Sequence, residues 1–158
     1  MTRPEYSFER DFTFHLARRR FGRNIPATDI DFLEFDNLRP VLVWEAKSNQ
    51  SKWRTGVRTA SMVAQWRLAT QANIEYRVVE HSHDWSQLCI VKVRGWYKMG
   101  YLWRPHIESE ITMSLPEFLA WLYSVRDRDM MAELPHGMFF HTEVPSALKP
   151  VSLRYESG

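Results

Sequence analysis

The pattern of hydrophobic and polar positions changes several times along the chain, and each change predicts an element. Residues 29–35 alternate polar and apolar side chains, the period-2 pattern of a half-buried strand. Asp36 and Asn37 follow, with side chains that stabilise turns. Pro40 is predicted to open a second strand, whose apolar run Val41–Trp44 gives way to Glu45, Ala46 and Lys47 at its end. The two strands are therefore expected to pair as a hairpin.

Helical spacing of apolar residues appears on both sides of this hairpin. Residues 5–20 are predicted as a first helix with a basic last turn. Residues 55–72 are predicted as a second helix, and Gln65 borders its apolar stripe. The stripe is formed by Val57, Ala60, Val63, Ala64 and Leu68.

Two further strands are predicted after the second helix, at residues 74–81 and 87–93. Residues 95–104 are aromatic and mixed in charge, which leaves open a strand or an irregular connection. Ser114, followed by Pro116 and Glu117, is typical of a helix start, and this helix is expected to run to about residue 129.

The order helix, strand, strand, helix, strand, strand, helix predicts an α/β fold with a mixed sheet and helices on its faces. The connection from the Glu45 strand to the strand at residues 74–81 is long enough for a parallel crossover. We expect a single domain over residues 1–158, with a loop-rich tail from about residue 133.

Composition narrows the class of protein without identifying it. The chain has 158 residues, is 44% hydrophobic and carries a net charge of +2, which permits a nucleic-acid partner. Cys89 is its single cysteine, so an intramolecular disulfide and a cysteine-based zinc site are excluded. Because no apolar run has membrane-spanning length, a soluble cytoplasmic protein without a membrane partner is expected, in the host cytoplasm if the protein is viral.

The ends of the predicted hairpin strands carry the candidate chemistry. Asp29 or Asp31 should meet Glu45 and Lys47 at one edge of the sheet, and strand alternation puts Glu45 and Lys47 on one face. Magnesium prefers oxygen ligands, which Asp31, Glu45 and the Ala46 carbonyl could supply. Lys47 could orient or deprotonate a water, or hold a phosphate oxygen. The alternative is a strand end with a solvated ion pair.

The sequence of elements around these residues resembles the PD-(D/E)XK nuclease family. Asp31 (or Asp29) matches the family's first acid, and Glu45-Ala46-Lys47 matches the E-x-K. Gln65 resembles a glutamine that some members carry on the following helix, and Glu9 matches the position of an additional acid in many members. The resemblance implies a nuclease dependent on Mg²⁺ or Mn²⁺, with a restriction-endonuclease-like mixed sheet of four or five strands flanked by helices.

Two aromatic and basic stretches lie outside this motif. The first suits a phosphate backbone and a stacked base, or is a solvated loop with its tryptophan in the core. It comprises Lys52, Trp53, Arg54 and Arg58. The second is expected in core or dimer packing and comprises Trp96, Tyr97, Tyr101 and Trp103.

The sequence thus predicts a metal-dependent deoxyribonuclease, an endonuclease in phage or mobile-element recombination, repair or DNA processing. Its expected catalytic residues are Asp31, Glu45, Lys47 and Gln65, and its expected metal ligands are Asp31, Glu45, Ala46, Asp29 and Glu9. DNA is the expected partner, with a homodimer or a larger nucleoprotein assembly left open. The alternatives are an inactive nucleic-acid-binding module and a virus assembly protein that retains the fold.

Overall fold

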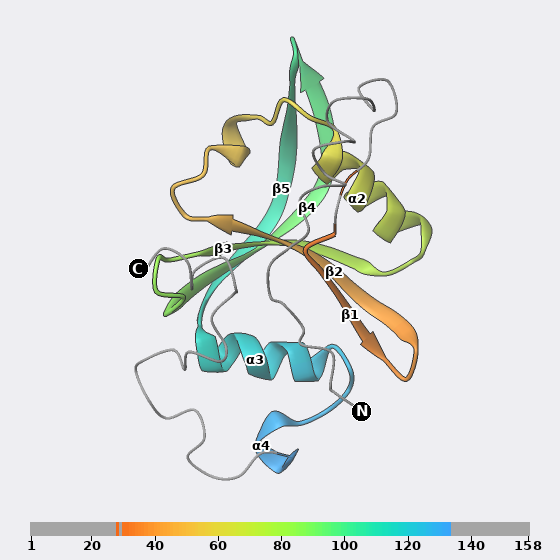
Figure 1. Cartoon of the computed structure of the whole chain (residues 1–158), viewed down its shortest axis with the longest axis vertical. Helices are drawn as coiled ribbons and strands as arrows, with labels where there is room; N and C mark the ends of the chain where they lie inside the picture. The colour runs from red at the N-terminus through yellow and green to blue at the C-terminus, as the bar shows by residue number, and fades with distance from the viewer. Residues whose placement is uncertain (1–27, 29, 134–158) are drawn as a thin grey trace, which may run out of the picture. The chain divides into compact units, whose positions relative to one another are not determined.

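The computed structural model describes residue 28 and residues 30–133, all within one compact unit, Thr28–Leu148 (Figure 1). The predicted first helix at residues 5–20 and the tail beyond residue 133 lie outside the described residues. Among the described residues, no helix is long and apolar enough to cross a membrane. The elements are β1 (Phe32–Asp36), β2 (Arg39–Ser48), the 3₁₀ helix η1 (Trp53–Thr55), α2 (Ser61–Gln71), β3 (Glu75–His81), β4 (Gln87–Met99), β5 (Leu102–Ser114), α3 (Leu115–Ser124) and α4 (Met130–Glu133).

The five strands form one mixed sheet in the order β1-β2-β3-β4-β5. The pair β2–β3 is parallel, and the other three neighbouring pairs are antiparallel. The chain passes from β2 to β3 through α2, so the predicted parallel crossover is confirmed. The predicted α/β class with a mixed sheet flanked by helices is confirmed as well.

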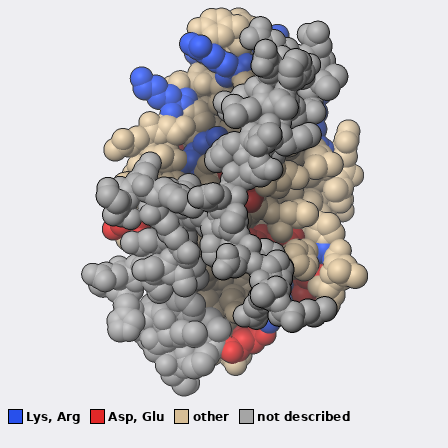
Figure 2. Space-filling view, in the orientation of Figure 1, with Lys and Arg blue, Asp and Glu red and all other residues tan. Residues whose placement is uncertain are grey.

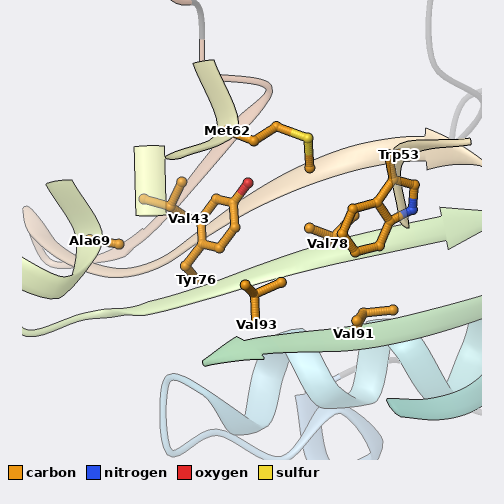
Figure 3. Close-up of a cluster of buried hydrophobic side chains, with 8 residues drawn as sticks. All are labelled: Val43, Trp53, Met62, Ala69, Tyr76, Val78, Val91 and Val93. Carbon is orange, nitrogen blue, oxygen red and sulfur yellow. The ribbon is translucent and has the colours of Figure 1, made fainter. Parts of the chain in front are cut away.

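Strand alternation assigns the side chains to two faces of this sheet. On one face, Val43, Tyr76 and Val78 pack in a buried cluster that includes Met62 and Ala69 of α2 (Figure 3). On the other face, Trp44 stacks on Phe32 with ring centroids 3.8 Å apart. Trp44 also meets Phe118 of α3 edge-on at 5.4 Å. The two helices therefore cover opposite faces of the sheet, which we call the α2 face and the α3 face.

Parallel pairing with β3 sets the end of β2. The strand runs to Ser48 because Glu45, Ala46 and Lys47 pair in register with Val78, Val79 and Glu80 of β3. The prediction that Glu45 and Lys47 stand at the end of this strand is confirmed. The Glu-x-Lys triplet lies inside a strand, where the backbone holds its side chains more rigidly than a loop would.

Two other predicted boundaries are corrected. The second helix begins at Ser61 and not at residue 55, because the chain first forms η1 and then turns at Gly56, whose φ of 139° favours glycine. The strand predicted at residues 87–93 continues to Met99. The aromatic residues 95–104, for which a strand or an irregular connection was left open, thus complete β4 and begin β5, with a turn at Gly100, whose φ is 61°.

The helix start predicted at Ser114 is confirmed by a capping box. The Ser114 hydroxyl accepts a hydrogen bond from the Glu117 amide at 3.4 Å, and the Ser114 amide donates to the Glu117 carboxylate at 2.9 Å. The prediction that this helix ends near residue 129 is wrong, because α3 stops at Ser124 and α4 follows as a separate short helix.

Candidate active site

Asp31 lies beside β2 because it directly precedes β1. Antiparallel pairing sets Phe32 opposite Trp44, so the next position outward places Asp31 opposite Glu45, next to Ala46. The Ala46 amide donates a hydrogen bond to Asp31 Oδ2 at 3.0 Å. The N–H and C=O of one strand residue point to the same side of the strand, so the Ala46 carbonyl also points toward the side where Asp31 lies. The predicted meeting of Asp31 with the Glu-x-Lys strand is confirmed.

Glu45 and Lys47 project together from the α2 face of β2. Lys47 Nζ lies 2.9 Å from Glu45 Oε1, so the prediction that they share a face is confirmed. Glu45 is only 9% exposed, whereas 29% of the Lys47 side chain is exposed. The carboxylate is therefore largely buried, and the ammonium beside it is more accessible to solvent.

The second carboxylate oxygen of Glu45 is the least satisfied polar atom of the cluster. Glu45 Oε2 is buried and accepts no hydrogen bond of ordinary geometry from the described part of the chain. Burial raises the pKa of the Glu45 carboxyl, and the nearby charge of Asp31 raises it further. The hydrogen bond and charge of Lys47, and to a smaller degree the Gln65 carboxamide, lower the same pKa. A buried carboxylate oxygen in this position favours a cationic partner.

Gln65 reaches the cluster from α2. It is 3% exposed, so it belongs to the buried face of the helix, although its spacing places it at the border of the apolar stripe. Its amide nitrogen donates to the Thr28 hydroxyl at 3.1 Å, and its carbonyl oxygen accepts from the Tyr76 hydroxyl at 3.4 Å. Gln65 thus connects the segment before β1 with β3.

Tyr76 is a site residue that sequence reasoning did not single out. Burial raises the pKa of its hydroxyl well above the ordinary value, and the charges of Glu45 and Asp31 add to this effect. The phenol therefore stays protonated and acts as a hydrogen-bond donor near the two carboxylates. Its position on the α2 face of β3 was visible in the strand alternation, but its nearness to Glu45 depends on the parallel register.

A second charged group lies next to this cluster and was also missed. Glu80, which is the register partner of Lys47, is buried on the same face. Its carboxylate accepts from Trp53 Nε1 at 2.8 Å and from Arg54 Nε at 3.1 Å to each oxygen, and Arg54 Nη2 completes a two-point contact. Arg54 also pairs with Glu110 of β5. The three charged residues Glu80, Arg54 and Glu110 form what we call the Arg54 network.

The structure divides the residues predicted to contact nucleic acid into two pairs. Lys52 and Arg58 are exposed. Trp53 is 2% exposed and therefore offers no ring face for base stacking, and Arg54 carries two carboxylates on its guanidinium. Trp53 thus packs in the core, as in the alternative stated for this stretch, and the partly exposed Arg54 is engaged in two ion pairs.

The cluster offers a small set of oxygen ligands of the kind that holds a magnesium-like cation. Over residues 28 and 30–133, no group of three or more His, Cys, Asp or Glu side chains is arranged to hold a metal. Magnesium is commonly held by one or two carboxylates, with waters and substrate oxygens completing its shell. Asp31, the buried Oε2 of Glu45 and the Ala46 carbonyl supply such a set. The predicted ligands Asp29 and Glu9 lie outside the described residues.

Comparisons with known proteins identify no relative, so the function of the chain has to be inferred from the geometry of the site. No protein-family model, no curated protein and no solved structure matches the chain. The fold and site together define an α/β protein whose Glu45–Lys47 pair lies near the carboxyl end of β2, beside the parallel strand β3. The carboxyl ends of strands are a common location for ligand sites in α/β sheets.

Proposed function

We propose that the protein is a Mg²⁺- or Mn²⁺-dependent nuclease of the PD-(D/E)XK type that hydrolyses phosphodiester bonds in DNA. One observation carries the proposal. The Asp31 carboxylate accepts a hydrogen bond from the Ala46 amide, and the two residues that flank Ala46, Glu45 and Lys47, project their side chains together from β2. The order of β1, β2, the α2 crossover and parallel β3 supports a restriction-endonuclease-like fold, which is part of the proposal.

Asp31, Glu45 and the Ala46 carbonyl would hold the cation in this proposal. A bound divalent cation supplies Lewis-acid stabilisation of charge on the phosphate and lowers the pKa of bound water. Glu45 is suited to the task because its Oε2 is buried and makes no hydrogen bond of ordinary geometry with the described residues. Asp31 is suited because the Ala46 amide fixes the orientation of its carboxylate.

Lys47 would act on the substrate side of the cluster. Its ammonium is partly exposed and lies 2.9 Å from Glu45 Oε1, so it can reach a phosphate oxygen or a water without leaving the carboxylate. Gln65 and Tyr76 would position the cluster, because their hydrogen bonds link α2 to β3 behind Glu45. We propose that this enzyme is an endonuclease that acts in phage or mobile-element recombination, repair or DNA processing.

The test measures metal binding and cleavage in the same set of proteins. Isothermal titration with Mn²⁺ should detect binding to the wild-type chain and none to Glu45→Ala. Nicking of supercoiled plasmid with Mg²⁺ or Mn²⁺ should be lost in Lys47→Ala. The matched controls are Glu108→Ala and Lys92→Ala, which remove the members of an exposed ion pair with a separation of 3.1 Å on the neighbouring strands.

Two results would overturn the proposal. The first is equal cleavage by the wild-type chain and Lys47→Ala, because the residue that acts on the water or phosphate would then be dispensable. The second is the absence of both Mn²⁺ binding and cleavage in a folded wild-type chain. Retention of DNA in that second case would point to a binding module that does not cleave.

A further inference from the structure

The hairpin formed by β4 and β5 extends beyond the rest of the sheet. β3 pairs with β4 over Leu88–Lys92, but β4 and β5 remain paired with each other up to Met99 and Leu102 (Figure 1). Residues 93–107 therefore form a two-stranded ribbon, about 20 Å long at the usual rise per strand residue. A bulge at Val93–Gly95 marks the point where the ribbon departs from the sheet. We call residues 93–107 the ribbon.

The ribbon carries positive charge and no negative charge. It contains Arg94, Lys98 and Arg104, and neither Asp nor Glu occurs in its 15 residues. Arg58 adds a further cation, because the preceding residue, Val57, pairs with the backbone of Trp103. Lys and Arg side chains gather at this end of the molecule (Figure 2).

Aromatic rings hold two of these cations in place. The Arg58 guanidinium carbon lies 6.0 Å from the ring centre of Tyr101, and Lys98 Nζ lies 5.8 Å from that of Trp103. Tyr101 itself is 70% exposed at the tip of the ribbon. Cations beside an exposed ring form a surface that can contact phosphates and a base or sugar together.

We propose that the ribbon, together with Arg58, binds the phosphate backbone of duplex DNA. A two-stranded ribbon has the width to lie along or within a major groove. Arg58, Arg94 and Lys98 would each contact a phosphate, and Tyr101 would contact the sugar or base at the ribbon tip. The choice of DNA as the occupant rests on the proposed nuclease function and on the absence of acidic side chains from the ribbon.

The test measures how DNA affinity depends on salt. The full chain is titrated into a fluorescent 20-base-pair duplex without divalent cation, and anisotropy gives the affinity between 50 and 200 mM NaCl. The triple variant Arg58→Ala/Arg94→Ala/Lys98→Ala should lose at least tenfold in affinity at low salt. With three phosphate contacts removed, its log–log salt slope should be smaller by about 2.7. A Tyr101→Ala variant should lose affinity with little change in slope.

The control variant removes three cations elsewhere and should bind like the wild-type chain. It is Arg39→Ala/Arg67→Ala/Lys92→Ala, which lowers the net charge by the same amount as the ribbon variant. Equal loss in both variants would show a general charge effect and overturn the inference. So would unchanged binding by the ribbon variant, or a wild-type chain that does not bind the duplex. A change from dimer to monomer in the ribbon variant, with unchanged DNA affinity, would show that the ribbon binds a second copy of the chain and not DNA.

Failure of this inference can be distinguished from failure of the nuclease proposal. The ribbon variant keeps Asp31, Glu45 and Lys47, so it should bind Mn²⁺ as the wild-type chain does. Salt-dependent binding through the ribbon, combined with no Mn²⁺ binding and no cleavage by the wild-type chain, would refute the nuclease and leave the ribbon as a DNA-binding surface. Cleavage that depends on Lys47, with no effect of the ribbon variant on DNA binding, would support the nuclease proposal and refute the ribbon as its DNA-binding surface.

Discussion

Replacing Glu80 with alanine should destabilise the protein far more than removing the other carboxylate of the Arg54 network. Glu80 accepts the indole N–H of Trp53 and the two-point contact of Arg54. Alanine at this position would leave the buried Trp53 donor without its acceptor, and half of the charge pairing of Arg54 would disappear. Glu110→Ala would remove the other partner of the same guanidinium and leave Trp53 unaffected.

The magnitude follows from the burial of each group. An unsatisfied buried donor such as the Trp53 N–H costs about 1–3 kcal/mol. The Arg54 side chain is 34% exposed, so its lost pairing is discounted for solvent screening to about 1 kcal/mol. The sum is about 3 kcal/mol, which lowers the melting temperature by about 10 °C in a protein of this size. Glu110 is 50% exposed at its side chain, and its removal should cost no more than about 1 kcal/mol.

Urea denaturation followed by circular dichroism measures both variants under the same conditions. A Trp53→Phe variant and the double variant Trp53→Phe/Glu80→Ala complete a cycle that isolates the indole hydrogen bond. The cycle should give a coupling of about 1 kcal/mol or more. If Glu80→Ala and Glu110→Ala lie within about 0.5 kcal/mol of each other, burial does not determine the contribution of these pairs, and the reasoning is wrong.

Three further perturbations test other parts of the structure. Burial raises the pKa of Glu45 above its ordinary value of 4.5, so in EDTA the wild-type chain should lose stability as the pH rises above that value, and Glu45→Gln should not. Urea denaturation of both proteins at pH 5 and pH 8 measures this. A difference in stability between the two proteins that is the same at both pH values would contradict it. Phe118→Ala should cost about 3–5 kcal/mol by the same measurement, because Phe118 is buried against Trp44, and a cost below about 1 kcal/mol would contradict that packing. Ser114→Ala should cost about 1 kcal/mol through loss of the hydrogen bond to the Glu117 amide, whereas Ser114→Asp should retain most of the stability, and equal loss in both variants would count against the capping box.

Local patterns predicted those parts of the site that are close in sequence. Asp31 and Ala46 are 15 residues apart and meet through a hairpin. Its turn is formed by Asn37 and Leu38, one residue beyond the predicted turn at Asp36 and Asn37. The pairing of Glu45 with Lys47 follows from strand alternation alone. These features depend on one turn and one register, so a single sequence is sufficient to predict them.

Features that depend on distant packing could not be predicted in the same way. Gln65 lies at the border of an apolar stripe, and its burial depends on the approach of Tyr76 from the strand after the helix. Glu80 looks like an ordinary solvent-facing position of an alternating strand until Trp53 and Arg54 of η1 cover it. The length of β4 was hidden because the bulge at Val93–Gly95 breaks the period-2 pattern.

The parallel pairing of β2 with β3 has a thermodynamic consequence for any cation at Glu45. The β1–β2 hairpin alone would leave this carboxylate in water, and its buried surroundings are completed only when the crossover closes and Gln65 meets Tyr76. A cation that prefers the closed arrangement would, by mass action, favour closure of α2 onto the sheet. Cation affinity and the protection of α2 amides from hydrogen exchange would then rise and fall together.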